Sequence, residues 1–171
     1  MSVIIIDGPE KAGKTTLINA LVDNFSSMGI KSERVHWGPV SPDDRVYSPL
    51  LREHCSDVNK IWVWDRGWPS EYVYGRLLGR DRRMNHDPWL GEWLHGRAVQ
   101  ACGGLRVILT GPDPITLAVL RDVDDLPVTT ASEQDLYVKY GKSFGWTVIK
   151  NLHTQESLNE SMDTIMIKLL V

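Results

Sequence analysis

The sequence predicts an α/β fold, in which a parallel sheet of about five strands is flanked by helices. The first observation is a β-branched run at residues 3–6 that leads directly into residues 8–15, Gly-Pro-Glu-Lys-Ala-Gly-Lys-Thr, and then into a helical pattern. The second observation is that strand and helix patterns alternate along the rest of the chain. Strands that are joined through helices pair in parallel, and their buried faces favour short, β-branched, apolar runs.

Each predicted element has its own local signal. The first helix follows the 8–15 segment, and its apolar residues recur at helical spacing until Gly29, a residue type that commonly ends helices. Near the end of the chain Leu158, Met162, Ile165, Met166 and Leu169 share one face of a helix. Further strands are expected at residues 34–36, 60–64, 105–109 and 146–149. Further helices are expected at residues 70–78, 89–101, 114–121 and 132–144.

Length and composition limit the class of protein. The 171 residues are expected to form a single domain that spans residues 1–171. The net charge of -3 gives no global basic signal for nucleic-acid binding. No signal-like segment or membrane-length apolar run occurs, so a soluble, cytoplasmic protein without a membrane partner is expected. Cys55 and Cys102 are expected to pack, and the five dispersed histidines predict no structural zinc.

Residues 8–15 fit the pattern G-x-x-x-x-G-K-[ST], which predicts a phosphate-binding P-loop. The preceding strand would deliver backbone N–H groups to a helix N-terminus, where they can surround a polyphosphate. In this interpretation Lys14 reaches the β- and γ-phosphates and Thr15 binds Mg²⁺. The predicted cofactors are therefore ATP and Mg²⁺, and the predicted cofactor-binding residues of the loop are Gly8, Ala12, Gly13, Lys14, Thr15 and Thr16.

A second polar element, Asp65-Arg66, ends the strong strand at residues 60–64. The carboxyl end of that strand would lie at the same sheet edge as the P-loop. Asp65 would bind Mg²⁺ through water or accept the proton of an attacking hydroxyl, and Arg66 would hold a substrate phosphate. The alternative is a local ion pair between these two neighbours.

The P-loop followed by Asp65-Arg66, with Ser70, Tyr72 and Tyr74 beyond, resembles the thymidylate kinase family over most of the chain. The resemblance implies a P-loop kinase fold, Mg-ATP as donor and a deoxynucleoside monophosphate as acceptor, and family members are often dimers. It places Glu10 beside the acceptor sugar and Lys11 where a loop cation stabilises the transferring phosphoryl group.

The predicted catalytic residues are thus Lys11, Lys14, Asp65 and Arg66. Arg52-Glu53-His54 is similar to the family's acceptor-site Arg-x-x-His, with one residue fewer between the ends, and makes Arg52 a candidate nucleotide contact. Arg121 would either contact ATP or pair with the acids that follow it. Ser70 and Tyr74 complete the acceptor residues that the resemblance implies.

The chain is short for this family between the P-loop and Asp65, which leaves a second substrate class open. A phage-type kinase that phosphorylates a hydroxymethyl group on a pyrimidine in DNA would act in the host cytoplasm. Arginines gather at positions 76, 80, 82, 83 and 97, and base-stacking candidates are Trp37, Trp68, Trp89 and Trp93. Trp37 and Trp68 are favoured because they follow strands, whereas Trp62 and Trp64 are expected in the core. The alternative is that these arginines and tryptophans form a solvated face and ordinary core.

The expected chemistry is in-line transfer of the γ-phosphoryl group of ATP without a covalent enzyme intermediate. A monophosphate acceptor needs no strong base, whereas a hydroxyl acceptor would make Asp65 more important as a proton acceptor. A nucleotide-dependent switch or binding module is the alternative from another class. The absence of an N-K-x-D guanine-reading motif disfavours that alternative.

Overall fold

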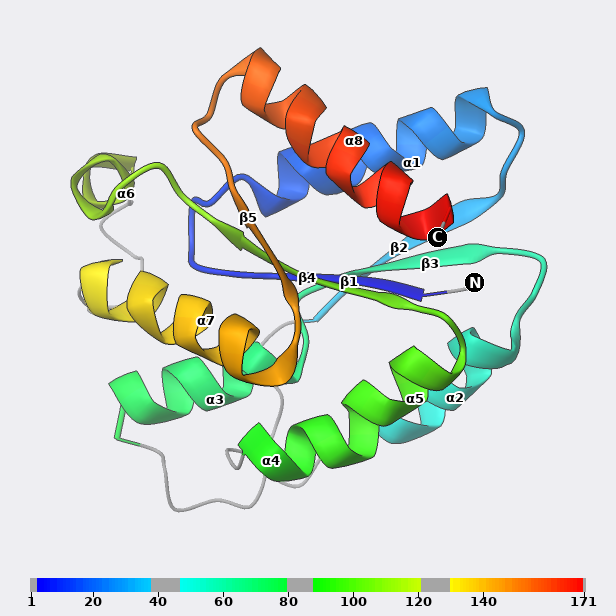
Figure 1. Cartoon of the computed structure of the whole chain (residues 1–171), viewed down its shortest axis with the longest axis horizontal. Coiled ribbons are helices and arrows are strands. Elements are labelled where there is room, and N and C mark those ends of the chain that lie inside the picture. Colours follow the sequence, from blue (N-terminus) through cyan, green and yellow to red (C-terminus); the bar gives the residue numbers. More distant parts are fainter. Residues whose placement is uncertain (1–2, 38–46, 80–87, 121–129, 171) are drawn as a thin grey trace.

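The computed structural model describes residues 3–37, 47–79, 88–120 and 130–170. Its centre is one parallel sheet in the strand order β2-β3-β1-β4-β5 (Figure 1). The strands are β1 (Val3–Asp7), β2 (Ser32–His36), β3 (Ile61–Asp65), β4 (Leu105–Thr110) and β5 (Thr147–Lys150). The α/β fold and the five predicted strands are confirmed, each strand lying within two residues of its expected position.

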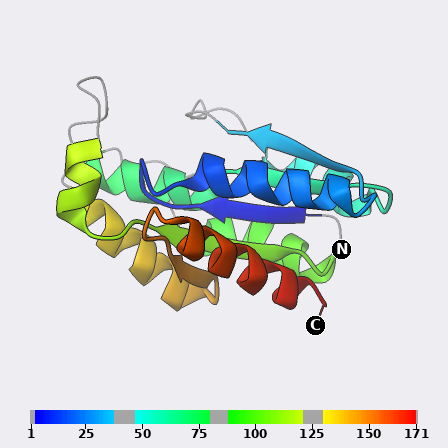
Figure 2. The same cartoon turned by 90° about the horizontal axis from the view of Figure 1, so that it is seen from above.

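Helices cover both faces of the sheet. On one face α1 (Lys14–Ser27) and α8 (Gln155–Leu170) lie side by side (Figures 1 and 2). On the other face lie α2 (Tyr47–Ser56), α3 (Trp68–Leu77), α4 (Pro88–Gly91), α5 (Arg97–Ala101) and α7 (Thr130–Phe144). The short helix α6 (Pro114–Leu120) follows β4.

Strand β1 shows why both faces must be covered. Val3 and Ile5 belong to the core beneath α3 and α7, whereas Ile4 and Ile6 belong to the core beneath α1 and α8. All four side chains are fully buried. A strand buried on both faces has no room for polar residues between its ends, which explains the continuous apolar run in the sequence.

Two features of the helical layer were not predicted. Helix α2 has only a short and weak apolar pattern, yet Leu51 and His54 bury against the core beside Trp64. The helix expected at residues 89–101 forms, but its middle is a π-helix, η2 (Glu92–Gly96), between α4 and α5. Cys55 on α2 and Cys102 after α5 are free thiols that lie against each other, as expected for packing residues.

The carboxyl ends of the strands meet at one edge of the sheet. Strand β1 lies between β3 and β4, with Ile6 opposite Asp65 on β3 and Asp7 opposite Ile108 on β4. The P-loop, which follows β1, therefore lies between the carboxyl ends of β3 and β4. This edge is on the left in Figure 1. No helix within the described ranges is long and apolar enough to cross a membrane.

Candidate active site

The P-loop folds tightly because two glycines permit close backbone contacts. Gly8 has φ 150°, and a Cβ there would overlap the carbonyl oxygen of Leu109 on β4. Gly13 has φ 89°, and a Cβ there would overlap the side-chain amide of Asn151. That amide donates to the Ala12 carbonyl at 2.9 Å and so ties the loop to the segment after β5. Both glycines are therefore required by the packing around the loop.

Lys14 is only 7% exposed, and its Nζ donates to the carbonyl oxygens of Gly8 at 2.9 Å and Pro9 at 2.6 Å. Burial lowers the pKa of Lys14 to about 8, and the nearby Arg66 guanidinium acts in the same direction. A buried ammonium beside backbone amides is a strong site for an anionic phosphate, which would replace the lost hydration.

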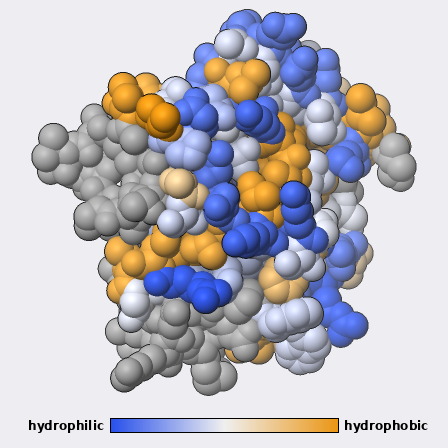
Figure 3. Space-filling view, turned by 60° about the vertical axis from the view of Figure 1, so that its left-hand side comes forward, coloured by the Kyte–Doolittle hydropathy of each residue, from blue (hydrophilic) through white to orange (hydrophobic). Residues whose placement is uncertain are grey.

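The loop opens onto a cleft of about 700 Å³. Most of the predicted loop and strand-end residues line it, namely Glu10, Lys11, Gly13, Lys14, Thr15, Thr16, Asp65 and Arg66. Gly8 and Ala12 are buried and are not part of this lining. Figure 3 shows this end of the molecule, where hydrophilic residues and hydrophobic patches lie side by side. The structure thus brings the two separate polar motifs of the sequence to one cavity.

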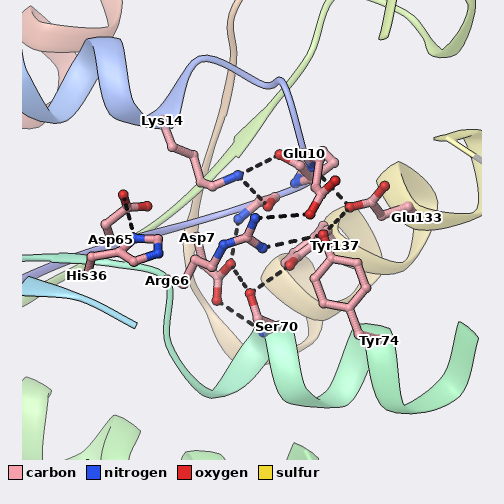
Figure 4. Close-up of polar contacts among 12 residues, drawn as sticks. Asp7, Glu10, Lys14, His36, Asp65, Arg66, Ser70, Tyr74, Glu133 and Tyr137 are labelled. Carbon is pink, nitrogen blue, oxygen red and sulfur yellow. Dashed lines mark hydrogen bonds and ion pairs between the residues drawn. The ribbon is translucent and has the colours of Figure 1, made fainter. Parts of the chain in front are cut away.

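Asp65 is paired, but not with its neighbour in sequence. Its Oδ2 accepts hydrogen bonds from Arg34 at 2.5 Å and from His36 Nδ1 at 3.1 Å, both on β2 (Figure 4 shows the His36 contact). The Asp65 side chain is 3% exposed, whereas that of His36 is 57% exposed. The local Asp65–Arg66 ion pair considered from the sequence is therefore wrong, because the parallel register places His36 opposite Asp65.

Arg66 turns the other way, into a cluster beside the P-loop (Figure 4). Its guanidinium donates to Tyr74 Oη at 3.3 Å and to Glu10 Oε1 at 3.4 Å. Glu133 on α7 is fully buried, and its Oε1 accepts from Tyr74 at 2.6 Å and from the Glu10 backbone N–H at 3.0 Å. Three elements that are distant in sequence therefore fix the position of one cation at the edge of the cleft.

Asp7, at the end of β1, fixes the start of α3. Its two carboxylate oxygens accept from the backbone N–H groups of Gly8, Gly67 and Ser70 and from Ser70 Oγ, at 2.7 to 3.0 Å. Burial raises the pKa of Asp7, an effect that the Ser70 hydrogen bond opposes. Ser70 is 7% exposed, is engaged by this network and by Tyr137, and does not line the cleft, so its role as a substrate contact stays a prediction.

The two favoured stacking tryptophans do not form an exposed platform. Trp68 is 3% exposed, packs against Trp146 and donates through Nε1 to Glu92. Trp37 is half-buried, with its ring centroid 4.9 Å from that of Trp64. Both were expected at the ligand edge because they follow strands, but their large apolar rings pack against the core. Trp62 and Trp64 lie in or against the core, as predicted.

The other acceptor predictions have different outcomes. Arg52 is exposed on α2 and does not line the cleft, while His54 stacks on Trp62 and accepts a hydrogen bond from Trp64. His54 therefore serves the packing of α2, and neither Arg52 nor His54 belongs to the lining of this cleft. Tyr74 joins the Arg66 cluster without lining the cleft. Arg121 lies outside the described residues.

Sequence reasoning missed several residues at this edge. Arg34 was hidden in a weak strand, and Glu133 lies 123 positions from Glu10, whose backbone N–H donates to it. The segment after β5 also lines the cleft through Asn151, His153, Thr154, Gln155 and Leu158. The only available signal was topological, because the end of β5 must reach the same edge as the P-loop.

Comparisons with known proteins identify the fold. No protein-family model matches the chain, and no curated protein matches it. A solved structure of YorR from Bacillus subtilis in complex with phosphorylated GDP has a TM-score of 0.61 and 18% identity, over 96% of this chain and 94% of that one. Thymidylate kinase from Ehrlichia chaffeensis has a TM-score of 0.55 and 17% identity, over 99% of this chain and 98% of that one. The chain therefore shares the P-loop α/β fold of these proteins across nearly its whole length.

Proposed function

We propose that this protein is a nucleotide kinase that transfers the γ-phosphoryl group of Mg-ATP to a deoxynucleotide-type acceptor. The observation that carries the proposal is the common cleft, in which the buried Lys14 ammonium and the Arg66 guanidinium approach from two adjacent strands. Lys14 would stabilise the negative charge of the donor phosphates, and Arg66 that of the acceptor phosphate. The shared fold with thymidylate kinase supports this reading by analogy.

At the donor end, Lys14 would contact the β- and γ-phosphates, and the exposed Lys11 on the same loop would approach the transferring group. Thr15 and Asp65 line the same cleft and offer hydroxyl and carboxylate oxygens, which are the ligands that Mg²⁺ prefers. Mg²⁺ usually keeps several waters and binds substrate phosphates, so one or two protein ligands suffice. When bound, Mg²⁺ would neutralise charge on the phosphates.

At the acceptor end, Arg66 is held by Glu10 and Tyr74 and lines the cleft. A guanidinium that is already oriented loses little side-chain entropy when it binds a phosphate. Glu10 borders the same space and would contact the acceptor through its carboxylate. The protein would then act by positioning the two substrates in line and by electrostatic stabilisation of the transferred group.

The test is transfer of labelled γ-phosphate from Mg-ATP to a panel of deoxynucleoside monophosphates, nucleosides and DNA with or without 5-hydroxymethyluracil. Labelled diphosphate from a free monophosphate would support the proposal. Lys14→Ala should lower transfer by at least about 100-fold, as expected when a key charge-stabilising group is removed. The exposed Lys142→Ala is the matched control and should leave transfer unchanged. Phosphate release without any labelled acceptor would instead indicate a nucleotide-dependent switch.

The His36–Asp65 pair favours a second candidate, a kinase that phosphorylates a hydroxyl group on a base in DNA. Because a carboxylate only accepts hydrogen bonds, the bond at 3.1 Å places the proton on His36 Nδ1 and leaves Nε2 as an acceptor in the neutral ring. An imidazole oriented in this way at a cleft can remove a hydroxyl proton. A monophosphate oxygen is already ionised and needs no such base.

His36→Gln separates the two candidates, because His36 would act only in proton removal, whereas Asp65 would also bind Mg²⁺ with either acceptor. For a hydroxyl acceptor, we expect the variant to lower kcat by about 100-fold or more, since general-base catalysis contributes on that order. For a monophosphate acceptor, we expect a loss of less than about tenfold. Asp65→Asn should lower transfer to both acceptor classes through the loss of a Mg²⁺ ligand, and transfer to the hydroxyl further. Equal losses with both acceptor classes in His36→Gln would contradict a role for this pair in proton removal.

A further inference from the structure

A second pocket, of about 340 Å³, lies on the helical layer that contains α4, η2, α5 and α7. It shares no lining residue with the cleft at the P-loop. Arg106, near the start of β4, and Phe144, just before β5, place this pocket toward the amino end of the strands, away from the phosphate-binding edge. The lining residues are Trp89, Glu92, Trp93, Gly96, Arg97, Gln100, Arg106 and Phe144.

The rim of this pocket exposes two tryptophans. Trp89 is 72% exposed and Trp93 is 61% exposed, although both residues are large and apolar. The Trp89 ring stands edge-on to Phe144, with centroids 5.0 Å apart, so its orientation is supported from below. The exposed Arg97 follows Trp93 by four residues and adds a positive charge to the same rim.

Hydrogen bonds to the buried Glu92 carboxylate fix the floor of the pocket. Glu92 Oε1 accepts hydrogen bonds from Trp146 at 2.7 Å, Trp68 at 2.8 Å and Tyr140 at 2.9 Å. Its Oε2 accepts from Arg106, and a Cβ at Gly96 would overlap this ion pair. The π-helix lies directly over these contacts, and π-turns occur frequently at functional sites. The exposed indoles thus project from a rigid base.

The exposed area of Trp89 and Trp93 indicates the size of the ligand that could cover them. Two indoles at these exposures present roughly 300 Å², taking about 200 to 250 Å² for each ring system. A stable protein interface buries about 800 Å² on each partner. The two indoles alone supply less than half of such an area, whereas their size matches one or two planar rings that stack on them.

We propose that the Trp89–Trp93–Arg97 surface binds single-stranded nucleic acid, with bases stacked on the two indoles and a backbone phosphate at Arg97. Aromatic side chains accept any base because every base has a π-face, and a neighbouring arginine supplies charge complementarity to the phosphate. The surface is separate from the cleft, so this inference does not depend on which acceptor the kinase site uses.

Fluorescence anisotropy with a labelled oligodeoxythymidine strand of about 12 nucleotides tests the proposal on the full chain. Trp89→Ala and Trp93→Ala should each weaken binding by roughly 5- to 100-fold, the usual effect of removing one stacked base contact. Arg97→Ala should weaken binding and reduce the slope of log K against log salt by about 0.7, the value for one phosphate contact on a single strand. Circular dichroism would show that the exposed substitutions leave the fold intact.

Matched controls keep the result specific. Arg52→Ala removes an exposed arginine on α2, and Leu170→Ala removes an apolar side chain that is 85% exposed on α8; neither should change strand binding. Lys14→Ala should abolish nucleotide binding at the P-loop while strand binding persists. Strand binding without any kinase activity would sustain this inference and reject only the proposed function.

Three results would overturn the inference. The first is no strand binding, or binding that the tryptophan substitutions do not alter. The second is strand binding that Lys14→Ala alone removes, which would place the strand in the cleft. The third is a dimer in sedimentation that Trp89→Ala converts to a monomer with strand binding unchanged, which would make the surface an interface between copies.

Discussion

At the scale of single residues, the P-loop keeps a charged group in an almost fully buried position. Lys14 is 7% exposed, and its pKa is lowered to about 8 mainly by burial. A bound triphosphate would favour the ammonium form and raise that pKa again. The proton of Lys14 is therefore linked to nucleotide binding.

This linkage predicts a pH dependence. Below pH 8 Lys14 is already charged, so affinity for Mg-ATP should be nearly constant, whereas above pH 8 binding must take up a proton and should weaken. From pH 7 to pH 9 we expect the Kd to rise about tenfold, measured by isothermal titration calorimetry. Lys14→Arg should bind more weakly with a flat profile, because guanidinium stays charged. A wild-type profile as flat as that variant would contradict the prediction.

The buried Asp7 carboxylate holds two segments of the chain together beside the cleft. It accepts backbone hydrogen bonds from both sides of the β3–α3 turn, at Gly67 and Ser70, and so joins that turn to β1. We expect Asp7→Ala to lower the free energy of unfolding by about 3 kcal/mol, because buried N–H groups lose their acceptor. Ser70→Ala should cost about 1 kcal/mol, since the backbone bonds remain.

Urea denaturation measures both changes. The matched control is Asp23→Ala, which removes an exposed carboxylate on α1 and should alter stability by less than about 0.5 kcal/mol. If Asp7→Ala were as mild as Asp23→Ala, the carboxylate would not be the main tie between β1 and α3.

At the scale of elements, Glu92 connects five segments of the chain. Its donors come from α3, β4, α7 and the turn before β5, while Glu92 itself begins the π-helix η2. A carboxylate that is 9% exposed with four donors is favourable only while every partner is present. This dependence makes the packing of η2 sensitive to one side chain.

We therefore expect Glu92→Ala to lower the free energy of unfolding by about 3 to 5 kcal/mol, the usual cost of breaking a buried ion pair. The comparison is Glu33→Ala, which breaks an ion pair with Lys60 between β2 and the start of β3 at a side chain that is 54% exposed. That change should cost less than about 1 kcal/mol. Equal losses in chemical denaturation would contradict the view that burial decides the difference.

At the scale of the whole molecule, one sheet supports the main polar segments of the cleft. The P-loop, the Asp65-Arg66 turn and the segment after β5 all leave the same parallel sheet, which has a core on each face. We propose that residues 1–171 unfold as a single domain, with a calorimetric enthalpy equal to the van't Hoff enthalpy. Mg-ATP at about 100 times its Kd should stabilise the whole transition by about 2.7 kcal/mol.

Differential scanning calorimetry with and without nucleotide checks this expectation. Two transitions, of which only one moves on addition of Mg-ATP, would show that the cleft belongs to a separately folding part. Lys14→Ala should retain the single transition and lose its shift with nucleotide, which separates ligand binding from domain organisation.

Local patterns predicted much of this architecture because the relevant forces act over a few residues. The β-branched run and the glycine-lysine loop identified β1, the P-loop and α1, and apolar periodicity identified α8. Helix α2 was missed because its stability comes from Leu51 and His54 packing on distant residues, not from its own pattern. The π-helix was also missed; it begins at Glu92, whose hydrogen-bond partners come from segments distant in the sequence.

By itself, the sequence determined the α/β fold, the strand, loop and helix around the P-loop motif and the sheet edge at which that loop lies, since motif spacing and alternation encode local backbone geometry and strand direction. Only the tertiary structure decided how the polar side chains pair. Because β2 pairs with β3 in this register, Asp65 forms its hydrogen bonds with His36 and Arg34. The packing of α7 places Glu133 beside the P-loop. Packing also buried Trp68 and left Trp89 and Trp93 exposed. Such choices depend on contacts between segments far apart in the chain, which no local pattern contains.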